Sequence, residues 1–152
     1  MDMVNSGRSP TPRHGITSGD RRFRDDFEAG AVPPADFGHR AHVRLAYTYL
    51  AESGVDDAAA RMRAALLAYL AHHGIDAAKY HETMTRAWIL AVRHFMQRSP
   101  GATGADAFID ANPALLDSRI MLTHYSAELL FSPEARARFV DPDLDPIPRQ
   151  NE

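Results

Sequence analysis

Apolar residues recur at intervals of three and four positions through most of the chain, which is the pattern of amphipathic helices. No stretch alternates between apolar and polar residues as a half-buried strand does. Four core helices are predicted, at residues 37–52, 57–73, 77–98 and 113–130. Shorter helices are expected at residues 21–29, 104–111 and 133–139. The predicted fold class is therefore all-α, a compact bundle of about four core helices with short extra helices.

Glycine and aspartate separate the core helices. Gly54 and Gly74 each follow a predicted helix, where a residue in the left-handed conformation often closes the last turn. Asp56 and Asp76 come two residues later and are expected to cap the next helices. These connections are short, so neighbouring helices are expected to be antiparallel.

The two ends of the chain lack this apolar period. Residues 1–20 are rich in Ser, Gly, Pro, Thr and Arg and are expected to form a disordered tail. Residues 141–152 repeat X-Pro steps, which oppose a helix and favour an extended strap or a loose end. A single helical domain is therefore expected at residues 21–140, between an N-terminal tail and a Pro-rich C-terminal tail.

The composition limits the kinds of functional site that the chain can form. Hydrophobic residues make up 45% of the chain, enough for one core, and cysteine is absent. Disulfides, thiolate zinc sites and a cysteine nucleophile are thereby excluded, so any metal would need His, Asp and Glu ligands. The net charge of −3 and the scattered basic residues argue against nucleic acid as the partner. No apolar run is long enough for a membrane span, so we expect a cytoplasmic protein without a membrane partner.

Histidines stand among the apolar positions of the first core helix. At about 100° per residue, His39 and His42 fall on the same side as Val43, Ala46 and Leu50. Residues three apart are neighbours on a helix surface. This spacing suits two ligands of one metal ion.

The third core helix repeats the pattern. His81 and Thr85 lie within its apolar stripe beside Trp88, and Glu82 falls at the edge of the stripe. Burying imidazoles costs free energy unless each polar atom has a partner. A cluster on these two helices therefore implies mutual hydrogen bonds, water or a metal. For each histidine alone, the simpler interpretation is a core residue bonded to a carbonyl group.

Known catalytic motifs do not supply a reaction. The segment H-E-T-M-T lacks the second histidine of the zinc proteases, because position 85 is threonine. Three segments are F-x-H-x-x-H-V-R-L-A from Phe37, Y-H-E-T-x-T from Tyr80 and Y-S-A-E-L-L from Tyr125. Together they resemble a set of small bacterial helical proteins of uncharacterised function, over roughly residues 27–145. The resemblance brings no established activity.

The leading hypothesis is a divalent transition-metal site. His39, His42 and His81 would bind zinc, iron or manganese, leaving a coordination position open for water or an unknown small molecule. Glu82 and Thr85 are the candidate catalytic residues, with Glu82 a fourth ligand or the base that takes a proton from bound water. Both hydrolytic chemistry and oxygen chemistry stay open. If Glu82 has no role in the site, it is a solvated carboxylate in the first turn of the helix.

Two further interpretations remain beside the metal site. In the first, the same pocket holds no metal and one imidazole acts as a general base. In the second, the protein is a non-catalytic accessory or regulatory module whose inward histidines are structural. Thr85 then bonds back to the preceding turn. The sequence also leaves a homodimer open.

Overall fold

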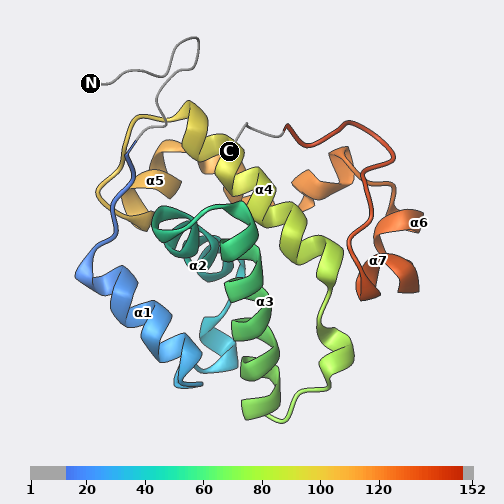
Figure 1. Ribbon diagram of the computed structural model, residues 1–152, viewed down its shortest axis with the longest axis horizontal. Helices are drawn as coiled ribbons and strands as arrows, with labels where there is room; N and C mark the ends of the chain where they lie inside the picture. Colours follow the sequence, from blue (N-terminus) through green and yellow to red (C-terminus); the bar gives the residue numbers. More distant parts are fainter. Residues whose placement is uncertain (1–12, 149–152) are drawn as a thin grey trace.

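The computed structural model describes residues 13–148, and within them it contains helices and no strand (Figure 1). The all-α prediction is confirmed. The α-helices are α1 (Ser18–Glu28), α2 (His39–Glu52), α3 (Val55–His72), α4 (Glu82–Arg98), α5 (Ala105–Ala111), α6 (Ala127–Leu130) and α7 (Pro133–Ala137). The 3-10 helices are η1 (Pro34–Asp36), η2 (Ala77–Lys79), η3 (Pro113–Leu116) and η4 (Ser118–Thr123). No helix in this range has the length and apolarity needed to cross a bilayer.

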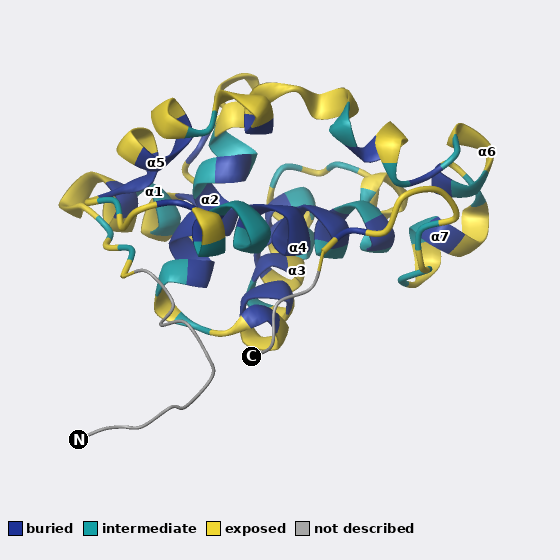
Figure 2. Cartoon of the chain, turned by 90° about the horizontal axis from the view of Figure 1, so that it is seen from above, coloured by how far each residue is buried: buried dark blue, intermediate teal, exposed yellow. Residues whose placement is uncertain are grey.

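Helices α2, α3 and α4 pack against one another and form the centre of the molecule. Leu45 of α2, Met62 of α3 and Ile89 of α4 are almost entirely enclosed. Figure 2 shows the buried residues gathered along the central helices, with exposed residues on the outer elements. Because burial of apolar surface is the main favourable term in folding, this three-helix centre holds the other elements in place.

The segment before α1 is docked on this centre, where a disordered tail was predicted. The His14 Nε2 donates to Met96 O at 2.8 Å, and Gly15 N donates to Ala102 O at 2.8 Å. The buried Tyr47 hydroxyl donates to Gly15 O. The tail prediction is therefore wrong for residues 13–20, because distant polar groups satisfy this backbone. Its remaining residues, 1–12, lie outside the described part of the chain.

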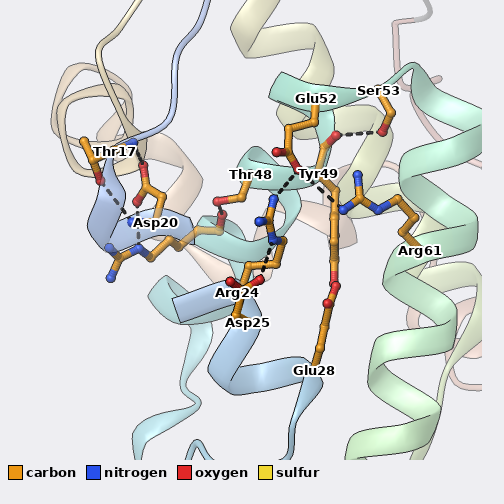
Figure 3. A network of polar contacts seen from close by, with 11 residues as sticks. Thr17, Asp20, Arg24, Asp25, Glu28, Thr48, Tyr49, Glu52, Ser53 and Arg61 are labelled. Atoms are coloured by element: carbon orange, nitrogen blue, oxygen red, sulfur yellow. Dashed lines mark hydrogen bonds and ion pairs between the residues drawn. The ribbon is translucent and has the colours of Figure 1, made fainter. Parts of the chain in front are cut away.

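Asp20 joins three elements at the start of α1. Its Oδ2 accepts from Thr17 N and Ala105 N, both at 3.0 Å, and its Oδ1 accepts from Arg44 Nε at 2.9 Å. Thr17 completes a capping box with Asp20. Figure 3 shows Thr17 and Asp20 in the polar network that runs along α1 and α2. Burial alone would raise the pKa of Asp20, but these donors outweigh burial and lower it.

Two predicted helices differ from the structure because polar side chains cap the backbone inside them. The range 113–130 is divided into η3, η4 and α6. Asp117 accepts from Arg119 N at the start of η4, and Ser126 accepts from Leu129 N at the start of α6. Such local bonds compete with a continuous helical ladder.

The predicted helix at 77–98 begins later than expected. Asp76 caps only η2, Tyr80 is extended, and α4 starts at Glu82 with His81 as its N-cap. Of the other capping predictions, the one for Gly74 is confirmed and those for Gly54 and Asp56 are wrong. Gly74 has the expected left-handed φ of 65°. Gly54 is instead the extended N-cap of α3, which leaves Asp56 in the first turn rather than at the cap.

Residues 141–148 form the extended strap that the X-Pro steps allowed. Leu144 N donates to His124 O at 2.9 Å, and the Asp143 carboxylate accepts from Ser126. Ile147 is buried. The strap therefore packs on the helical domain; residues 149–152 of the predicted tail lie outside the described chain.

Candidate functional site

Three of the five predicted site residues line one cavity. His42, His81 and Thr85 contribute to a cavity of about 360 Å³, whereas His39 and Glu82 do not. The cavity lies between η1, the C-terminal half of α3, η2 and the first turn of α4. Apolar side chains make up most of its wall, among them Phe37, Leu66, Tyr69, Leu70, Ile75 and Met84.

His42 lines this cavity and has a buried ring nitrogen without a partner among the described residues. Its ring stacks on Phe37, with ring centroids 5.4 Å apart and planes inclined by 29°. The Nε2 atom is buried and has no hydrogen-bond partner among the described residues. Burial, with a smaller effect from nearby His39, lowers the pKa of His42 to about 4. The ring is therefore neutral at pH 7, and its Nε2 makes no hydrogen bond to the described residues.

His81 has both ring nitrogens engaged. Its Nδ1 accepts from Met84 N at 3.1 Å, which caps α4, and its Nε2 lies 2.7 Å from Leu130 O. A carbonyl oxygen only accepts, so Nε2 carries the proton and the lone pair on Nδ1 serves the cap. Burial lowers the pKa of His81, which keeps this neutral form. No lone pair is left for a metal in this arrangement.

His39 is also bonded to the backbone. Its Nε2 donates to Leu115 O at 2.8 Å and so joins the start of α2 to η3. The ring meets Trp88 edge to face, with centroids 4.7 Å apart. These contacts are those of a core histidine bonded to a carbonyl.

The two candidate catalytic residues are occupied by neighbours. The Thr85 hydroxyl donates to His81 O at 2.8 Å, which is the bond to the preceding turn expected of Thr85 in the non-catalytic interpretation. The Glu82 carboxylate accepts from the Tyr80 hydroxyl at 2.7 Å and pairs with Arg63 Nε at 3.3 Å. Burial and this hydrogen bond raise the pKa of Tyr80, which therefore stays protonated.

The arrangement does not assemble the expected metal ligands. Across residues 13–148, no group of three or more His, Asp or Glu side chains is placed to hold a metal ion. His39 and His81 each direct Nε2 to a different carbonyl group. This geometry gives no support to the metal hypothesis. The alternative, a pocket that holds no metal, has the cavity that it requires.

Sequence reasoning missed the part of the wall that α3 provides. Leu66, Tyr69 and Leu70 follow the three-and-four spacing of an apolar stripe, which marked them only as core. Lys79 and Tyr80 also line the cavity, and the sequence pattern assigns neither of them a place in a site. A stripe shows which side of a helix is buried but does not show where packing leaves a space.

Comparison with models of protein families, with curated proteins and with solved structures finds no match for this chain. The resemblance carried by the three motifs stays a prediction. A functional inference must therefore come from the chemistry of the cavity.

Proposed function

We propose that this protein binds a small, largely apolar molecule in the cavity, with His42 Nε2 as its polar contact. The supporting observation is the buried, unpartnered Nε2 in an apolar wall. A buried polar atom without a partner costs about 1–3 kcal/mol, which a hydrogen bond from a ligand would offset. The cavity of about 360 Å³ also lies within the usual size range of small-molecule sites.

Binding accounts for this site better than acid–base catalysis does. A general base works best when its pKa is near the working pH, and the pKa of His42 is about 4. His81 and Thr85 already have partners on the backbone. We therefore assign the cavity a ligand and no reaction.

In this proposal the other two histidines are structural. His39 holds η3 and His81 holds the end of α6, each through a backbone carbonyl. These bonds hold the neighbouring elements in place, and the Nε2 atoms that make them are not free to contact the ligand. This part of the proposal keeps the interpretation of inward histidines as core residues.

The test uses 4-propylphenol, a neutral molecule with an apolar body and one hydroxyl group. Calorimetry should show 1:1 binding, and NMR of ¹⁵N-labelled histidine should show a shift confined to the His42 ring. His42→Phe should weaken binding of 4-propylphenol about tenfold, the equivalent of one hydrogen bond, and leave binding of propylbenzene nearly unchanged.

Matched variants locate the binding site. Leu66→Phe adds volume inside the cavity and should abolish binding, whereas Leu116→Phe makes the same change at an exposed position of η3 and should not. Equal affinity in both variants would refute the proposal. A shift of His39 and His42 together on adding Zn²⁺ alone would instead support the metal hypothesis.

A further inference from the structure

The rim of the cavity carries one cation whose side chain has no partner in the described structure. Lys79, the sole lysine of the chain, ends η2, is exposed and lines the cavity. Within residues 13–148 its ammonium group forms no ion pair. An apolar cavity with one cation at its rim suits a ligand that has an anionic end.

The nearest carboxylates along the chain are engaged elsewhere. Asp76 accepts from Ala78 N, two residues along the chain. Glu82 is held by Tyr80 and Arg63. A negative group at Lys79 is therefore not supplied by these neighbours.

A second cation strengthens the positive character of this edge. Arg136 of α7 directs Nη1 to Ala78 O at 3.4 Å, beside Lys79. Its charge also contributes to lowering the pKa of His81, after the larger effect of burial. The rim near η2 therefore carries two cationic side chains, Lys79 and Arg136.

We infer that the ligand is an amphipathic organic acid whose carboxylate pairs with Lys79 while its apolar body fills the cavity. A hydroxyl group on the body would meet His42 Nε2 inside. This inference rests on the proposed function and adds the chemical class of the ligand. An exposed ion pair contributes little, so its expected effect is a gain of about fivefold in affinity.

Three probes separate the two polar contacts: 3-(4-hydroxyphenyl)propionate has both groups, 3-phenylpropionate only the carboxylate, and 4-propylphenol only the hydroxyl. By calorimetry at pH 7 and low salt, the first should bind about fivefold more tightly than 4-propylphenol. This advantage should shrink as salt is added. The hydroxyl should favour the first over 3-phenylpropionate, and His42→Phe should remove that preference.

The charge contact is tested by Lys79→Gln. This variant should remove the advantage of the carboxylate and change the affinity for 4-propylphenol far less. Arg98→Gln is the matched control, because it removes the same charge at the exposed, opposite end of α4. It should preserve the fivefold advantage.

The outcomes distinguish the inference from the function on which it rests. If 4-propylphenol binds in the cavity but the carboxylate brings no gain, or if Arg98→Gln and Lys79→Gln act alike, the ligand class is wrong and the proposed function stands. If none of the three probes binds, both are refuted.

Discussion

His42 and His81 lie on the wall of one cavity, but their hydrogen bonding differs. His81 satisfies both ring nitrogens with Met84 N and Leu130 O. His42 leaves Nε2 without a partner among the described residues. Their sequence environments are alike, because His42 follows Phe37, His81 follows Tyr80, and both histidines fall among apolar positions. Only the packed structure distinguishes the histidine whose two ring nitrogens are both bonded from the one that has an unpartnered nitrogen.

The unsatisfied ring predicts that His42→Phe stabilises the free protein. Phenylalanine keeps the stacking on Phe37 and removes the orphan nitrogen, so the free energy of unfolding at pH 7 should rise by about 1 kcal/mol. Urea denaturation measures this change. A loss of stability would mean that Nε2 has a partner in the free protein.

His42 also predicts a pH dependence of stability. Its pKa is about 4 when folded against 6.5 for the exposed ring, so the unfolded chain binds the proton first as the pH falls. Because of this difference in pKa, the free energy of unfolding is highest above pH 6.5 and falls by up to about 3 kcal/mol as the pH drops from 6.5 to 4. Denaturation at pH 7 and pH 4.5 should show a smaller difference for His42→Phe than for the unchanged protein. Equal differences would contradict the assignment.

At the scale of elements, the long helices were the most predictable. The ranges predicted for α2, α3 and the body of α4 agree with the structure to within a few residues, because an apolar period sustained over several turns is a strong signal. The range 113–130 failed because Asp117 and Ser126 bind backbone N–H groups that a continuous helix would use.

The start of α4 explains why the predicted site was only partly right. A helix from residue 77 would place His81 and Thr85 one turn apart with both side chains directed inward. His81 is instead the N-cap, its Nδ1 bonds Met84 N, and Thr85 bonds back to His81 O. Sequence periodicity predicted that His42, His81 and Thr85 point inward, and all three line one cavity. It could not show that the Nδ1 lone pair of His81 would cap α4.

The N-cap predicts graded effects at position 81. His81→Ala removes the cap and leaves Leu130 O without its donor, so unfolding should become easier by about 2 kcal/mol. Asparagine is a good N-cap, so His81→Asn should cost about half as much. Urea denaturation gives both values, and exchange of the Met84 amide hydrogen should be faster in the alanine variant. Equal losses in the two variants would argue against the capping role.

At the scale of the whole molecule, Asp20 connects elements that are far apart in the sequence. One carboxylate binds Thr17 before α1, Arg44 in α2 and Ala105 at the start of α5. The sequence marks Asp20 as a polar residue in a tail, because the period of α1 is short and its partners are remote. Long-range polar contacts of this kind have no periodic signature.

Asp20→Asn should therefore be strongly destabilising. It removes the charge that pairs with Arg44 and disturbs the hydrogen bonds from Thr17 N and Ala105 N, so the free energy of unfolding should fall by about 3 kcal/mol at pH 7. The folded pKa of Asp20 lies below 3.8, so its contribution is present above that pH and is lost as the pH falls through the folded pKa. Asp26→Asn is the control on the exposed side of α1, with an expected change within about 0.5 kcal/mol. Similar losses in both variants would show that the three-element contact contributes little.

The docking of the segment before α1 sets an order of events during synthesis on the ribosome. His14 bonds Met96 and Asp20 bonds Ala105, residues made 82 and 85 positions later. At translation rates of about 5–20 residues per second, these partners follow α1 by roughly 4–17 s. Tyr69 of α3, on which Phe27 stacks, is made 42 residues after Phe27, so Phe27 lacks this ring for roughly the first 2–8 s of that interval. The contacts that hold α1 in place are therefore completed only once the start of α5 has been made.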